Sequence, residues 1–73
     1  MIIDFKASDL TTFEGRFDGH LIQILKQSNG DWSLYVDFVP VKDSRRSSAR
    51  GCMDLAEKAA NNILAAKVKK GAN

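Results

Sequence analysis

The turn Ser28-Asn29-Gly30-Asp31 constrains this chain more than any other feature of its sequence. Before the turn, Leu21 to Leu25 are apolar except for Gln23, and after it apolar and polar residues alternate from Trp32 to Phe38. Two β-prone runs around an Asn-Gly turn are the strongest short-range signal for a β-hairpin. The sequence therefore predicts a hairpin over residues 20–41 at the centre of the fold.

The length of that turn decides which side chains share a face of the hairpin. A three-residue loop over 28–30, with Gly30 left-handed, pairs Ile24 with Leu34 and agrees with a two-residue loop at Asp18-Gly19. A two-residue Asn29-Gly30 loop is the alternative, and it would pair Leu25 with Leu34. We favour the three-residue loop because it collects the apolar residues on one face. That face would comprise Phe13, Phe17, Ile22, Ile24, Trp32, Leu34, Val36 and Phe38.

Shorter elements are expected on both sides of the hairpin. Residues 1–5 are read as an edge strand or an anchored tail, and residues 6–12 as turn-prone. A strand runs from Phe13 to Phe17, in which Gly15 marks a bulge or a close backbone approach. Pro40 has no amide hydrogen to donate and should end the sheet. A polar, basic link over 42–48 then leads into the last element.

From Ala49 onward the hydrophobic period becomes that of an α-helix. The helix is expected to end near Lys69-Lys70, with Gly71 as its cap. Its buried stripe is placed through Ala59, so that a large residue there would overpack the interface at a cost of ~1–3 kcal/mol. The stripe reads Cys52, Ala56, Ala59, Ile63 and Ala66, flanked by Met53, Ala60, Leu64 and Leu55.

These elements predict an α+β fold. We expect an antiparallel sheet of three to four strands, with one long C-terminal amphipathic helix packed on one face. The 73 residues suit a single domain over 1–73, and a chain of this size buries only about 60% of its unfolded surface. Self-association or a partner would therefore add needed stability.

The sequence points to a cytoplasmic protein without catalytic machinery. One cysteine cannot form an intrachain disulfide, and there is no apolar run near the ~20 residues that a membrane span requires. The only histidine, His20, has no second ligand at metal-binding spacing, and Cys52 falls on the helix stripe, where a thiol packs as a small apolar group. We expect no enzyme activity, no metal, no cofactor and no small-molecule substrate.

Two surfaces remain as candidate contact sites. With the favoured register, Leu21, Leu25, Tyr35 and Val39 lie on the outer face of the sheet, where they could contact a protein partner; single exposed apolar residues are also ordinary. The second surface is basic and comprises Lys42, Arg45, Arg46 and Arg50. Guanidinium groups beside a helix start can bind phosphate, or they can simply be solvated or paired with acids of the sheet.

Charge is divided unevenly along the chain. Residues 1–43 carry four Lys or Arg against seven Asp or Glu, a net −3, whereas residues 44–73 carry seven against two, a net +5. Such a division suits docking to a charged partner, or attraction between the two halves of one molecule.

Three resemblances suggest what such a chain could do. The tail is faintly similar to the last hairpin and helix of double-stranded-RNA-binding domains, but residues 1–19 lack the N-terminal helix of that family. A hairpin before an Ala-rich helix also resembles HicB-like antitoxin half-domains, without their Pro-Gly-rich link. By size and build the chain looks like accessory proteins of phages and mobile elements, including anti-CRISPR inhibitors. The first resemblance covers Arg45-Arg46, Ala49, Ala56, Ala59-Ala60 and Ile63-Leu64.

The first expectation for function is a small non-enzymatic module that binds a protein partner, or a second copy of itself as a homodimer. The alternative is a nucleic-acid-binding domain that uses the basic segment at the helix start. An enzyme is the third class.

Overall fold

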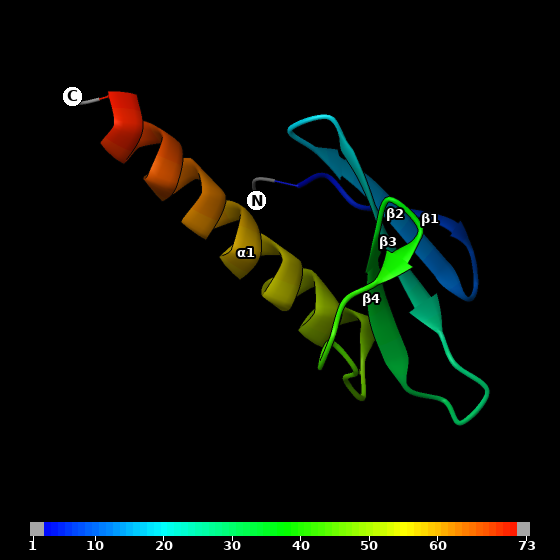
Figure 1. The fold of residues 1–73 in the computed structure, drawn as a ribbon. Helices are drawn as coiled ribbons and strands as arrows, with labels where there is room; N and C mark the ends of the chain where they lie inside the picture. Colours follow the sequence, from blue (N-terminus) through cyan, green and yellow to red (C-terminus); the bar gives the residue numbers. More distant parts are fainter. Residues whose placement is uncertain (1–2, 72–73) are drawn as a thin grey trace.

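The protein is an antiparallel five-stranded sheet with one helix packed on it, described from a computed structural model that covers residues 3–71, with side chains for residues 3–62. The predicted α+β fold is confirmed, with five strands in place of the three to four expected. The strands follow one another in chain order, and the helix lies across one face (Figure 1). The elements are β1 (Lys6–Asp9), β2 (Thr12–Phe17), β3 (His20–Lys26), β4 (Trp32–Val36), β5 (Val39–Pro40) and α1 (Ala49–Gly71).

The register favoured from the sequence is confirmed. Ile24 lies opposite Phe13 on one side and opposite Leu34 on the other, and Ile22 lies opposite Val36. Gly30 has a φ of 91°, and its N–H donates to the Gln27 carbonyl at 3.0 Å. The three-residue loop with a left-handed glycine therefore places the apolar side chains on the face that α1 covers.

The first strand lies later in the chain than predicted. Residues 6–9 pair with β2, whereas the part of the predicted edge strand that the structure describes, residues 3–5, does not pair. Ile3 is completely buried and Phe5 packs against the same core, so this segment serves as an anchor instead. The predicted close approach at Gly15 is confirmed, since a Cβ on Gly15 would lie 2.6 Å from Ile3 Cγ2.

A turn that the sequence did not signal divides the last predicted strand. Asp37 and Phe38 both have positive φ, 51° and 68°, and connect β4 to the two-residue strand β5. Positive φ at both central residues is the geometry of the tight hairpin turn that normally takes Asn-Gly or Asp-Gly. Phe38 is consequently 73% exposed and does not belong to the buried face.

The basic link after β5 is ordered along the edge of β4. Trp32 and Arg46 exchange two main-chain hydrogen bonds of 2.8 Å. Ser44 is 2% exposed, and its hydroxyl accepts the Leu34 N–H at 3.0 Å and donates to the Leu34 carbonyl at 3.3 Å. The link therefore completes the hydrogen bonding of β4, where β5 is too short to do so.

The helix begins at a serine cap and packs on the sheet through small residues, a cysteine and two alanines. The Ser48 hydroxyl accepts the Gly51 N–H at 3.2 Å, a typical N-cap bond. The buried row is Cys52, Ala56 and Ala60, one residue per turn, whereas Ala59 is exposed. The expectation that a large residue at Ala59 overpacks the interface is therefore wrong. Ile63, Leu64 and Ala66, which the sequence also placed on this face, lie beyond residue 62, the last residue whose side chain the structure describes.

Candidate functional site

The outer face of the sheet is the face that α1 leaves open (Figure 1). Side chains alternate along β3 and β4, so Leu21, Leu25 and Tyr35 point away from the helix while Ile24 and Leu34 point toward it. All three outward residues are half-buried among their neighbours on the strands. They form a partly apolar strip over the two central strands, which we call the outer strip.

Polar groups surround the outer strip. Gln23 lies between Leu21 and Leu25 on β3, and its side-chain amide donates to Glu14 Oε1 at 3.1 Å. A shallow hollow of about 450 Å³ borders Leu21 and is lined in part by Lys6, Glu14 and Arg16. Apolar contact area ringed by charged side chains of both signs has the composition of an ordinary protein interface.

Val39 does not belong to the outer strip, although the sequence placed it there. The turn at Asp37-Phe38 sets Val39 opposite Val36, and paired residues share a face of the sheet. Val39 therefore lies on the helix side of the sheet, at its edge, with 64% of its surface exposed.

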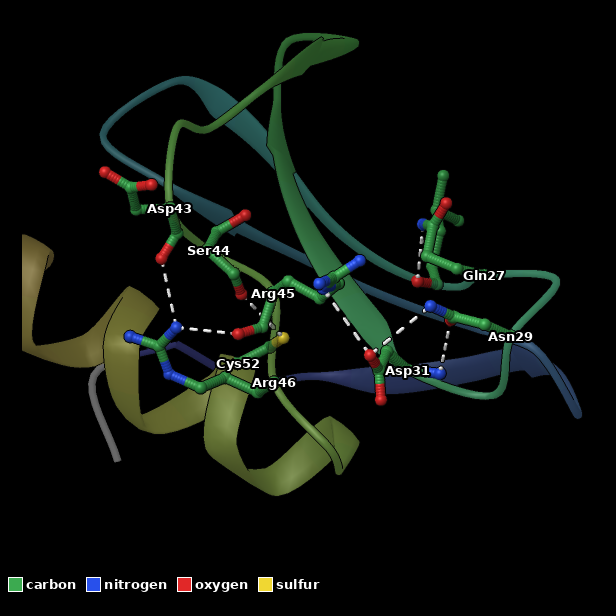
Figure 2. A network of polar contacts seen from close by, with 9 residues as sticks. Gln27, Asn29, Asp31, Asp43, Ser44, Arg45, Arg46 and Cys52 are labelled. Atoms are coloured by element: carbon green, nitrogen blue, oxygen red, sulfur yellow. Dashed lines mark hydrogen bonds and ion pairs between the residues drawn. The ribbon is translucent and has the colours of Figure 1, made fainter.

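Two arginines of the basic segment, Arg45 and Arg46, make contacts within the molecule, as Figure 2 shows. Arg46 Nη1 donates to the carbonyls of Asp43 and Arg45 at 3.0 and 2.8 Å. Arg45 lies 3.5 Å from Asp31, and Arg50 lies 3.8 Å from Asp54. A phosphate would have to compete with these contacts.

Lys42, the fourth residue of the predicted anion site, is exposed in the turn that begins the link. The four cations do not converge on one point, because Arg46 folds back on its own loop while Arg45 reaches toward the Asn29–Asp31 turn (Figure 2). The geometry offers separate charges, without the convergent fork that binds a phosphate tightly.

A histidine and an aspartate meet at the end of the sheet beside the Asp37-Phe38 turn. His20 Nδ1 lies 2.6 Å from Asp37 Oδ2, and because the carboxylate can only accept, the ring nitrogen donates. Asp37 also accepts the Leu21 N–H at 3.0 Å through its other oxygen. The two residues are 17 positions apart, so the sequence carried no signal for this pair.

The contacts of Asp37 predict its titration. The hydrogen bond from His20, then that from the Leu21 N–H and the nearby charge of Arg16, hold the pKa of Asp37 below its ordinary 3.8. A lowered pKa in the folded state contributes stability above the ordinary value, and this is lost as the pH falls through the lower one. Carboxyl-carbon NMR should show Asp37 titrating below 3.8.

The replacement His20→Gln should raise the titration midpoint of Asp37, because it removes the hydrogen bond from His20, which is the largest cause of the lowered pKa. Asp9 is the internal control, because the hydrogen bonds from Thr11 lower its pKa independently of His20. An Asp37 midpoint at or above 3.8 in the unmodified protein would show that the pair does not form.

Cys52 is confirmed as a packed side chain. It is fully buried, and its thiol donates to the Ser44 carbonyl at 3.4 Å. Burial raises the pKa of this thiol above its ordinary value, which disfavours the thiolate that a nucleophile requires.

Within residues 3–62 no three His, Cys, Asp or Glu side chains gather as a metal site would require. No helix in the described part of the chain is long and apolar enough to cross a membrane.

Comparison with known proteins found no match to this chain among family models, curated proteins or solved structures. Function must therefore be inferred from the residues themselves.

Proposed function

We propose that this protein is a non-enzymatic module that binds a protein partner through the outer strip, Leu21, Leu25 and Tyr35. The observation that carries the proposal is the position of α1: the helix covers one face of the sheet, and the apolar residues of the two central strands on the other face remain uncovered. The solvated face of an antiparallel sheet whose other face packs on the core usually carries polar side chains.

The charges around the strip favour a protein over a nucleic acid. Lys6, Glu14 and Arg16 bring both signs to the same surface, whereas a nucleic-acid interface is predominantly positive. Among the arginines that would serve nucleic-acid binding, Arg46 bonds to carbonyls of its own chain, and Arg45 and Arg50 each lie beside a carboxylate. Nucleic-acid binding through the basic segment remains the alternative that an experiment has to exclude.

Capture from the native cell with four matched baits tests the proposal. The baits are the unmodified protein, Leu21→Thr/Tyr35→Thr on the outer strip, Arg45→Ala/Arg46→Ala/Arg50→Ala on the basic segment, and Leu10→Thr as a control. Leu10 is 94% exposed in the turn between β1 and β2, so its loss removes apolar area without touching either surface. Threonine keeps the β-propensity of the strands.

We expect the outer-strip bait to lose the partner, with a reduction of about ten-fold or more. The arginine and Leu10 baits should retain it. The partner should also resist washing with salt, because apolar contacts are insensitive to ionic strength while phosphate contacts fall steeply with it. Loss of binding in the arginine bait, together with sensitivity to salt and nuclease, would reverse the ranking in favour of the alternative.

The analogy with accessory proteins of phages and mobile elements stays a prediction. It was drawn from size and build, and it contributes no residue to the proposed contact surface.

A further inference from the structure

The turn between β4 and β5 displays an aromatic side chain on an unfavourable backbone. Val36 and Val39 lie opposite each other, so Asp37 and Phe38 are the two residues of the loop. Phe38 is 73% exposed, and Val39 beside it is 64% exposed. The φ of Phe38 is 68°, in the left-handed region that a bulky side chain normally avoids.

The other left-handed residues within 3–71 are of two types that tolerate this conformation. They are glycines and aspartates: Gly19, Gly30, Asp18, Asp37 and Asp43. Glycine has no Cβ, and the short polar side chain of aspartate can hydrogen-bond to the nearby backbone. Phenylalanine has neither property. Local preference therefore explains the other left-handed residues of the described chain and does not explain Phe38.

Burial within the chain does not explain Phe38 either. Its ring does not belong to the side chains that pack against the described core. An exposed apolar residue is ordinary where the backbone is relaxed, as at Leu10, which is 94% exposed without a positive φ. Phe38 combines exposure with strain. Strained residues that the surrounding structure holds in place are typical of sites that contact another molecule.

Three hydrogen bonds at Asp37 hold the turn in place. The Asp37 N–H donates to the Leu21 carbonyl at 2.8 Å. The Asp37 carboxylate accepts the Leu21 N–H at 3.0 Å and His20 Nδ1 at 2.6 Å. These bonds tie the turn to the first residues of β3 and fix the chain that leads into Phe38. An aromatic side chain with two rotatable bonds on a fixed backbone loses little conformational freedom when it binds.

The charges at the turn favour a protein as the binding partner. His20 and Arg16 lie near the Asp37 carboxylate, so both signs are present. Asp37 is ionised at neutral pH, because its pKa lies below 3.8. Nucleic acids and anionic membranes bind predominantly positive surfaces, and a carboxylate next to Phe38 opposes them. An apolar pocket of a protein carries no phosphate, and aromatic side chains that fill such pockets contribute most to protein interfaces.

We propose that the β4–β5 turn is a second protein-contact site, at which the Phe38 ring, flanked by Val39, inserts into an apolar pocket of another protein. Asp37 and His20 act as positioning residues, since they hold the turn through which Phe38 is displayed. The site uses none of the side chains of the outer strip. It is therefore independent of the partner site proposed above, and either can fail without the other.

Thermal unfolding of Phe38→Gly tests whether the phenylalanine is strained. The substitution makes the loop Asp-Gly, a dipeptide that this tight turn prefers, and glycine adopts the positive φ without strain. The thermal midpoint of the full chain should therefore rise by several degrees. Leu10→Gly removes an equally exposed apolar side chain at a residue without positive φ, and it should not raise the midpoint. A midpoint that does not rise in Phe38→Gly would overturn the proposal, because Phe38 would then carry no strain to explain.

Photo-cross-linking in extract of the native cell tests the contact itself. The photoreactive residue p-benzoylphenylalanine replaces Phe38 in one sample and Leu10 in the control. We expect a protein adduct from position 38 that position 10 does not give. Added unmodified protein should suppress this adduct, whereas Phe38→Gly should require a concentration about ten-fold higher or more for the same suppression.

The remaining outcomes of the cross-linking experiment contradict the proposal. Equal suppression by Phe38→Gly and by the unmodified protein would show that the ring does not bind. So would the same adduct from positions 38 and 10, or no adduct from either. Mass spectrometry identifies the molecule that is attached, and a nucleic acid, a lipid or a second copy of this chain would replace the proposed partner.

Discussion

Replacing Gly15 by alanine is expected to destabilise the protein by about 1–3 kcal/mol, the usual cost of forcing a methyl group into a filled site. The new Cβ would lie 2.6 Å from Ile3 Cγ2 and 3.3 Å from the Asp4 carbonyl oxygen. Ile3 is fully buried and β-branched, so it has little freedom to move aside. A gain of about 0.4–1 kcal/mol from the stiffer unfolded chain is smaller than this cost.

A double-mutant cycle identifies the cause. Ile3→Ala alone should cost about 2–5 kcal/mol, as expected for a buried isoleucine. On that background Gly15→Ala should cost less than it does alone, because the closest atom it meets has gone, while Phe5 Cδ1 at 3.2 Å and the Asp4 carbonyl oxygen at 3.3 Å remain. Urea unfolding followed by Trp32 fluorescence measures all three variants. Additive costs would show that Ile3 does not pack over Gly15, and that the N-terminal segment is not the anchor described above.

Removing the Ser44 hydroxyl is the second substitution with a large expected effect. Ser44→Ala leaves the buried Leu34 N–H without the acceptor it has at 3.0 Å, and an unsatisfied buried donor costs about 1–3 kcal/mol. The Leu34 carbonyl keeps its bond from the Val41 N–H, so the loss falls on the donor alone. The same urea experiment should show the decrease.

Ser47→Ala is the matched control, since Ser47 is an exposed serine of the same link. It should change the free energy of unfolding by less than about 0.5 kcal/mol. Equal stability of the Ser44→Ala and unmodified proteins would mean that the link does not lie along β4. The arginines that it positions would then be free of their present contacts.

The hairpin could be predicted because its signals are local. Asn29-Gly30 selects the turn, and the alternation around Ile24 and Leu34 selects the register, so the buried face followed from short-range chemistry. The turn at Asp37-Phe38 carries no such signal. A phenylalanine in left-handed conformation contradicts local preference, and the error moved Phe38 and Val39 off the faces predicted for them.

On the predicted helix face Cys52, Ala56 and Ala60 are buried, and Ala59 was misplaced because alanine gives a weak pattern. Ala59 and Ala60 are equally apolar, and only the sheet decides which of them is buried. The contacts of the basic segment could not be predicted for a different reason. Composition reports the charge of Arg45 and Arg46, but their acceptors are main-chain carbonyls and an aspartate on another loop, and these become neighbours only in the fold.

Proton NMR with a soluble paramagnetic agent, recorded before and after addition of the captured partner, tests the outer strip most directly. In the free protein the signals of Leu21, Leu25 and Tyr35 should broaden more than those of Ile24 and Leu34, which α1 covers. The partner should then protect the three outer residues and leave Arg45, Arg46 and Arg50 as exposed as before. Protection of the arginines, with the outer strip still broadened, would contradict binding through the open face of the sheet.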